Sequence, residues 1–474
     1  MKRVAALLAL AACTPDDLRP PTGHVLLHVD TDAPVAPPPG TPLASDAAAP
    51  LFDRLLVEVF EPGETQPCDG CVAELDIDTD VLSRGGSFAV VPPGPTSGLR
   101  VRLRMFLRAR LVDGVIAPEA TVEVVAALPP VPEEGAVDAS LFLPTDAVGF
   151  PRGSLEQPVD TEPGAFTNSR VGTWAPAQRR DCAGAPPART VCVPGGAFFM
   201  GHPRVQFEPG SVENTGITDA TKQRVVVLAP FFLDAHEATV AEIRASGAVA
   251  TDAVVFWSGG TTGANETDWC PYTASPDPVR EALSMSCIRW SGARQYCQAR
   301  GGDLPTEVQL EYVMGALQSR LFVWGSDLPD CDDTVWARRT EPVFLACAEG
   351  LPPADIGGPV ALPSGIDPNA PPPPRTRDRL VLPTGVIFDL AGNQAEFSLD
   401  YHQTQDEPCW NQPSSNVFFD PYCATSGMLG PSHTFRGGNW ADAHHYITAA
   451  AMRRGMGETL LTAGIGLRCA FPSP

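Results

Sequence analysis

Residues 436–447, near the C-terminus, hold the densest group of side chains that could do chemistry, in the stretch RGGNWADAHHYI. Asp442 and His444 stand two positions apart, so both would face the same side of a strand, where a carboxylate and an imidazole could bind zinc or non-haem iron. His445 would face the opposite side. A stable metal site needs a third ligand, and no other histidine in the sequence has a compelling position. The stretch is therefore either an active site or the frame of one whose reactive groups are missing.

Other catalytic patterns are missing from the sequence. There is no G-x-S-x-G motif of a nucleophilic serine, and the glycines lack the spacing of a phosphate-binding loop. The CDGC motif at Cys68 and Cys71 lies between a strand-like run and the acidic stretch AELDID, and no second cysteine pair with zinc spacing follows it. We expect a local structural disulfide there.

Length, composition and charge narrow the class of protein. The chain has 474 residues, enough for two or three domains, and 43% of them are hydrophobic. Its 51 prolines and 43 glycines favour turns and loops over long helices. The net charge is −23 and lysine occurs only at Lys2 and Lys222. Such an acidic surface repels phosphate backbones, so we expect no nucleic-acid partner.

The N-terminal sequence MKRVAALLALAAC resembles a bacterial lipoprotein signal peptide. Lys2 and Arg3 precede a short apolar core, and residues 10–13 match the lipobox in which Cys13 is lipidated and becomes the mature N-terminus. The alternative is an ordinary alanine-rich stretch after a misplaced start codon. Because Thr14 and not aspartate follows Cys13, we expect residues 1–13 to direct an outer-membrane lipoprotein, facing the periplasm or the cell surface. Since no apolar run reaches the roughly 18 residues of a membrane span, the lipid anchor would be its only membrane contact.

The cysteine count agrees with export. There are 13 cysteines, and lipidation of Cys13 leaves an even number, as expected for disulfides in an oxidising compartment. Cys297 and Cys469 are far apart in sequence, and spacing alone does not prove any pairing. The other cysteines are close neighbours that we expect to pair: Cys68 with Cys71, Cys182 with Cys192, Cys270 with Cys287, Cys331 with Cys347, and Cys409 with Cys423.

Short runs of β character fill residues 22–146. They include HVLLHVD at 24–30 and LRVRLRMFLRARLV at 99–112, separated by turn clusters rich in proline and glycine. The alternation of apolar and polar residues predicts half-buried strands, and we expect a β-sandwich of about six to eight strands. Residues 147–181 predict a linker. A different domain is expected at 182–474.

Two helices are predicted within the C-terminal domain, between residues 287 and 316. Gly301 and Gly302 would end the first helix, because glycine is the common residue just beyond a helix C-terminus. Thr306 and Gln309 form a capping-box pattern at the start of the second helix.

The motifs of this domain together resemble the formylglycine-generating enzyme family, also called the sulfatase-modifying-factor domain. Over about residues 190–472 they occur in the family's order: VPGGAFFMG, FFLDAHEAT, LPTEVQLEY, VWG, DLAGNQAEF, RGGNW and GLRCA. The resemblance implies an α+β domain related to C-type lectins and poor in regular secondary structure. The predicted fold class is therefore α+β, with the β-sandwich preceding this domain. The resemblance also implies a disulfide between Cys297 and Cys469.

The family binds structural calcium at the segment that matches DLAGNQAE. The resemblance implies carboxylate ligands from Asp389 and Glu396 and backbone carbonyls from Gly392 and Gln394, the oxygen ligands that calcium takes. The alternative is that the two acidic residues only cap the tight turn around Gly392.

Catalytic family members hold copper through two cysteines after the glycine pair and oxidise a substrate cysteine to formylglycine. Alignment on Gly437 and Gly438 places Asp442 and Ile447 at those positions. Neither is the soft ligand that Cu(I) prefers, so we expect no copper and no catalytic residue of the family's own chemistry.

The favoured hypothesis is a non-catalytic binding or scaffold module at the cell envelope that binds a protein, peptide or glycan. Its expected cleft is lined by Arg436, Trp440, Asp442 and His444. The alternative is a metal-dependent oxidoreductase that modifies a cysteine or another side chain through a changed metal site.

Overall fold

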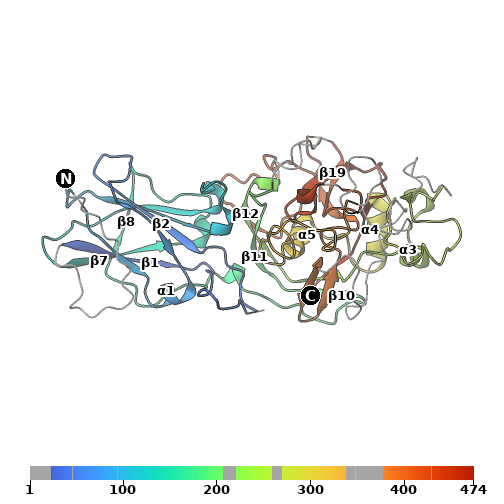
Figure 1. Cartoon of the computed structure of the whole chain (residues 1–474), viewed down its shortest axis with the longest axis horizontal. Coiled ribbons are helices and arrows are strands. Elements are labelled where there is room, and N and C mark those ends of the chain that lie inside the picture. Colours follow the sequence, from blue (N-terminus) through green and yellow to red (C-terminus); the bar gives the residue numbers. More distant parts are fainter. Residues whose placement is uncertain are drawn as a thin grey trace.

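The computed structural model describes residues 23–44, 46–92, 94–205, 220–258, 269–337, 347, 377–428, 430–442 and 444–474. The predicted signal peptide and lipidation site at Cys13 lie outside these residues. Within the described ranges, no helix is long and apolar enough to cross a membrane. Figure 1 shows two β-rich parts side by side along the long axis of the molecule.

The N-terminal part consists of two sheets that share one hydrophobic core. Alternation of apolar and polar residues explains why the sheets pack on each other, as strand β5 (Arg100–Phe106) shows. Val101 and Leu103 point into the core, while Arg102 and Arg104 lie on the other face and pair with Glu58. The first sheet has the order β4 (Ser87–Val90), β1 (His24–Thr31), β7 (Ala136–Leu143) and β9 (Glu162–Pro163). The second has the order β3 (Val72–Asp76), β2 (Arg54–Phe60), β5, β6 (Val122–Ala127) and β8 (Val159–Asp160). The short helices of this part are α1 (Thr79–Ser83), η2 (Arg108–Arg110), η3 (Pro118–Ala120) and η4 (Thr145–Ala147).

Residues 147–181, expected as a linker, pack onto the N-terminal part. Strand β8 pairs with β6 and strand β9 pairs with β7. Trp174, just before η5 (Ala175–Ala177), is buried in the N-terminal core and donates its indole N–H to Asp146. This stretch is thus attached to the sheets over most of its length.

The C-terminal part has small sheets and short helices, so the predicted mixture of sheets with little helix is confirmed. Two three-stranded sheets have the orders β10 (Thr190–Val193), β13 (Phe231–Asp234), β21 (Ala470–Pro472), and β11 (Gly196–Met200), β12 (Arg224–Leu228), β17 (Val417–Phe419). A hairpin joins β14 (Arg379–Leu382) to β15 (Gly385–Phe388). A four-stranded sheet has the order β19 (Arg453–Gly457), β18 (Ser432–Arg436), β16 (Ala395–Tyr401), β20 (Ile465–Gly466). The helices of this part are α3 (Val240–Ser246), η6 (Thr251–Ala253), α4 (Trp290–Ala299), α5 (Glu307–Met314) and η8 (His445–Thr448).

Both predicted helices of the C-terminal domain are confirmed. Helix α4 ends just before Gly301, whose φ of 86° is the left-handed conformation that glycine adopts without strain. Helix α5 begins with the predicted capping box: the Thr306 hydroxyl accepts the Gln309 N–H, and the Gln309 side chain accepts the Thr306 N–H. The capping box fixes where α5 starts and therefore where the Glu307 side chain lies.

A continuous core joins the two parts of the chain. Phe199 of β11 and Val225 of β12 belong to the same buried cluster as the N-terminal sheets. Arg110 of the N-terminal part is 4% exposed and reaches into the C-terminal part, where it donates to Gln223 and to the Gly201 carbonyl. In Figure 1, β11 and β12 lie where the two parts meet.

The disulfide predictions are confirmed by six bonds among the described residues. Five join the close neighbours in sequence. The sixth joins Cys297 of α4 to Cys469 beside β21, across 172 positions, as the resemblance implied. It ties the middle of the domain to the end of the chain.

Candidate functional site

The RGGNW segment turns sharply after strand β18 and packs on the DLAGNQAE turn. Gly437 has a φ of 76°, and a side chain at Gly438 would collide with Thr448 and approach the carbonyl oxygen of Ala391. The Trp440 N–H donates to the Asn393 carbonyl at 2.9 Å. The glycine pair therefore serves the close approach of two loops.

Asp442, which the sequence resemblance predicts at the position of the family's first copper-binding cysteine, is held in an ion pair. Its carboxylate oxygens accept from both terminal nitrogens of Arg454, at 3.2 and 2.9 Å. One oxygen also accepts the Asn439 N–H at 2.9 Å. The side chain is 13% exposed. This bidentate, charge-assisted contact fixes the position of the carboxylate.

Arg436 does not line a cleft, which corrects that expectation. It is 1% exposed and its guanidinium lies between Glu307 and Glu311, at 2.7 and 2.8 Å. Arg453 of β19 binds Glu307 from the other side, through its Nε at 2.6 Å and Nη2 at 2.8 Å. Burial opposes ionisation of Glu307, but Arg453 and Arg436 outweigh it and lower the pKa of this carboxyl to about 2.

Trp440 is also inside the protein rather than on a cleft wall. It is 4% exposed, packs on Trp269 with ring centroids 5.2 Å apart, and donates its indole N–H to the Ala463 carbonyl. His444 is half-buried, and His445 lies 4.7 Å from the ring of Trp336. The expected cleft is therefore not formed by the predicted set, because its two largest members are used for packing.

In the described ranges, neither a third metal ligand nor a thiolate joins Asp442. Among the described residues, no group of three or more histidine, cysteine, aspartate or glutamate side chains has an arrangement that could hold a metal ion. Ile447 lies half-buried in η8. Every cysteine in the described ranges is disulfide-bonded. The described part of the chain therefore contains no free cysteine thiol.

The predicted calcium residues belong to a buried acidic cluster. Asp389 and Glu396 lie within electrostatic reach of Asp378 and Glu237, and Arg468 is the guanidinium that faces Glu396. Burial, followed by the charge of Asp389, raises the pKa of Asp378 to about 6. Burial also raises the pKa of Glu396 to about 7, against the opposing effect of Arg468. Such an excess of buried negative charge favours a cation.

The sequence missed which acids cap the turn at 389–393. Asp378 accepts the N–H groups of Leu390 and Ala391, and Glu237 accepts the Gln394 N–H. Asp378 and Glu237 therefore cap the turn in place of Glu396. One oxygen of Glu396 and the side-chain oxygen of Gln394 are buried without a hydrogen-bond partner among the described residues. Gly392 packs against Thr334 so closely that a side chain would collide. Oxygen atoms are the ligands that calcium takes.

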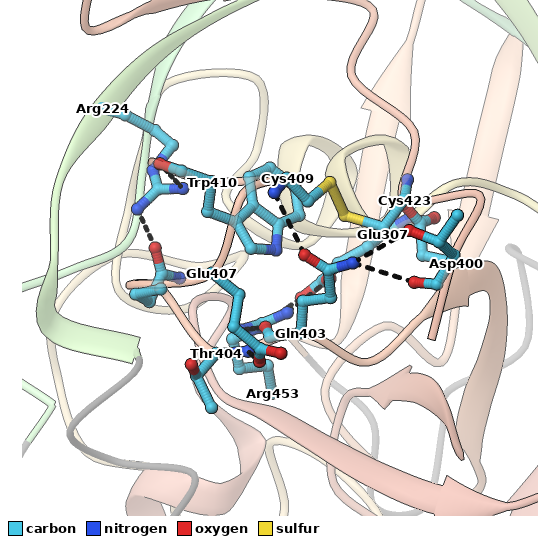
Figure 2. Close-up of a disulfide and its surroundings, with 12 residues drawn as sticks. Arg224, Glu307, Asp400, Gln403, Thr404, Glu407, Cys409, Trp410, Cys423 and Arg453 are labelled. Atoms are coloured by element: carbon cyan, nitrogen blue, oxygen red, sulfur yellow. Dashed lines mark hydrogen bonds and ion pairs between the residues drawn. A yellow bond between two sulfur atoms is a disulfide. The ribbon is translucent and has the colours of Figure 1, made fainter. Parts of the chain in front are cut away.

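A surface cavity of about 610 Å³ lies beside the Cys409–Cys423 disulfide. Gln403 accepts the Cys409 N–H and donates to the Thr425 carbonyl, so it connects both walls. Figure 2 shows this disulfide with Gln403 beside it. Asp400, below the cavity, accepts the N–H groups of Cys423 and Glu307, which links the wall to the buried ion cluster. Burial, followed by the charge of Glu307, raises the pKa of Asp400 to about 7.

A second cavity, of about 720 Å³, lies between the two parts of the chain. Its lining comes from Leu43, Ala44, Asp46 and Ala47 of the N-terminal part, the connection at 179–186, the loop after α5, and strand β14. The sequence did not predict this cavity, because a cavity between domains has no local sequence pattern.

One family model and several solved structures match this chain. Among curated proteins, none matches this chain. PvdO from Pseudomonas aeruginosa is 16% identical, with 61% of this chain and 99% of PvdO covered and a TM-score of 0.37. Variable protein 1 of Treponema denticola is 12% identical; the match covers 60% of this chain and 96% of that protein, with a TM-score of 0.33. CarF is 14% identical; the match covers 60% of this chain and 97% of CarF, with a TM-score of 0.33. The model of the sulfatase-modifying factor enzyme 1-like domain matches residues 176–472, more than half of the chain, and the chain belongs to this family.

Proposed function

We propose that this chain is a non-catalytic binding module of its family, stabilised by disulfides. The observation that carries the proposal is the Asp442–Arg454 ion pair at the position where the family's chemistry needs a thiolate. A carboxylate already satisfied by a guanidinium and a backbone N–H is a poor ligand for a soft metal ion. The second position holds Ile447, which has no ligand atom.

The N-terminal part supports a binding role. We infer that its two sheets form a β-sandwich, and their single shared core supports this. Because that core continues into β11 and β12, the sandwich would hold the family domain rigidly. A partner could then contact both parts at once without an ordering cost for the domains.

We further propose structural calcium at Asp389 and Glu396, with carbonyls of Gly392 and Gln394, and no copper. Export as an outer-membrane lipoprotein through Cys13 remains our proposal for the location. The many disulfides support it, since such bonds persist in oxidising compartments. The partner would be a protein, peptide or glycan of the envelope.

The test incubates the whole chain, with its disulfides formed, with a cysteine-containing sulfatase-motif peptide, oxygen and copper, and then with iron. The peptide mass is the readout. We expect an unchanged peptide. The matched variant, Asp442→Cys with Ile447→Cys, tests whether the surrounding frame can still hold copper. Conversion of the peptide by the unmodified chain would refute the proposal and favour the metal-dependent oxidoreductase.

A further inference from the structure

The cavity between the two parts runs along one edge of the β14–β15 hairpin. Every residue of β14 lines it, and no residue of β15 does. A cavity over the face of the hairpin would touch alternate residues of both strands, because side chains alternate between faces. The cavity therefore lies on the side of β14 that faces away from β15.

Among the described residues, no third strand pairs with that side of β14. β14 and β15 form a two-stranded sheet, with Arg379 opposite Phe388 and Leu382 opposite Gly385. In an antiparallel pair, alternate residues direct their N–H and C=O groups away from the partner strand. Such an edge can accept another strand through main-chain hydrogen bonds.

The edge also offers an apolar contact. Val381 is 67% exposed, whereas its neighbour Leu380 is 8% exposed and packs in the C-terminal core. Leu380 holds the strand in place, and Val381 is left for a ligand. Leu43, from the N-terminal part, lines the same cavity.

The charge of the cavity is opposite in sign to that of the chain. Arg179, Arg320 and Arg379 line it together with two aspartates, Asp46 and Asp181, in a chain of net charge −23. Arg179 donates to the Ala47 and Leu317 carbonyls and to the Tyr312 hydroxyl. Among the described residues, none of the three arginines forms an ion pair with a carboxylate.

We propose that this cavity is a docking groove for an extended, acidic peptide segment of a partner protein, which adds a strand to the free edge of β14. On the face of β14 that Arg379 and Val381 share, the segment would place an apolar side chain against Val381 and, two positions away, a carboxylate against Arg379. A further carboxylate would pair with Arg320. The inference rests on the proposed binding function and names its partner class. Because Leu43, Ala44, Asp46 and Ala47 form one wall, it also gives the N-terminal part a role in recognition.

The experiment measures binding of the fluorescent octapeptide Val-Thr-Glu-Thr-Val-Thr-Glu-Thr, whose valines and glutamates share one face of a strand, to the whole chain by anisotropy. The same peptide with lysine in place of both glutamates tests the charge requirement, and the peptide with proline in place of its two middle threonines tests the main-chain pairing. Arg320→Glu with Arg379→Glu is the test variant. Arg84→Glu with Arg152→Glu, two exposed positions outside the cavity, is the control with the same change in net charge.

We expect saturable binding of the acidic peptide, weakened about tenfold or more by the double substitution in the groove and by no more than about twofold in the control. The lysine and proline peptides should bind at least about tenfold more weakly. Absence of saturable binding, equal binding of the proline peptide, or an equal loss in the control variant would each overturn the proposal. The peptide-oxidation experiment does not involve β14. If the acidic peptide does not bind, the non-catalytic assignment is therefore unaffected. If the unmodified chain oxidises the sulfatase-motif peptide, the binding result at β14 is likewise unaffected.

Discussion

Replacing Glu307 with glutamine tests the buried ion cluster that anchors helix α5 to the sheet. Glu307 and both of its arginine partners, Arg436 and Arg453, are fully buried, with three hydrogen bonds of 2.6 to 2.8 Å. The folded-state pKa of Glu307 is about 2 against an ordinary 4.5, which corresponds to about 3 kcal/mol of stability above pH 4.5. Removing one member of a buried ion pair costs about 3 to 5 kcal/mol in other proteins. We expect Glu307→Gln to lower the free energy of unfolding by about 3 kcal/mol at pH 7.

Urea unfolding of the whole chain, followed by tryptophan fluorescence, measures this cost. The carboxylate is stabilising where it is ionised in both states, so its contribution is complete above pH 4.5. The contribution falls as the pH drops toward 2, and the difference between wild type and Glu307→Gln should shrink with it. Asp406→Asn removes an exposed ion pair with Lys222 and should cost less than about 1 kcal/mol. A cost below about 1 kcal/mol for Glu307→Gln, or one that does not change with acidification, would refute the assigned charge network.

Three further predictions concern other parts of the fold. Replacing both Cys297 and Cys469 with alanine should cost about 5 kcal/mol because the bond closes 172 positions, whereas the same change at Cys68 and Cys71 should cost about 2 kcal/mol, as thermal unfolding would measure. Fragment 182–474 alone should bind a hydrophobic dye and melt at a lower temperature than the whole chain, because Phe199, Val225 and Val227 lose their cover; equal melting temperatures would contradict the shared core. Millimolar calcium should raise the melting temperature, and a chelator should reverse the change. Glu396→Gln should abolish this response to calcium. A response that survives the substitution would place the ion elsewhere.

Local sequence patterns predicted the parts of the structure that depend on neighbours in the chain. The capping box at Thr306 and Gln309 is one example, because both residues act within a single helical turn. The alternation in β5 is another, because one side of a strand must be apolar when it faces a core. The close cysteine pairs also formed, since short loops bring their ends together at small entropic cost.

Tertiary structure decided which side chains are available for function. Arg436 and Trp440 belong to a motif with the composition of an active site, but the sequence does not show that Glu307, 129 positions away, and Trp269 would bury them. The same holds for Asp378 and Glu237, which cap the turn at 389–393 from distant segments. The groove along β14 depends on segments of both parts of the chain. Sequence determined the family, the disulfides and the missing thiolates, because these depend on residue identity. The fold alone determined burial, ion pairing and which strand edge is left unpaired among the described residues, because these depend on contacts between residues far apart in the chain.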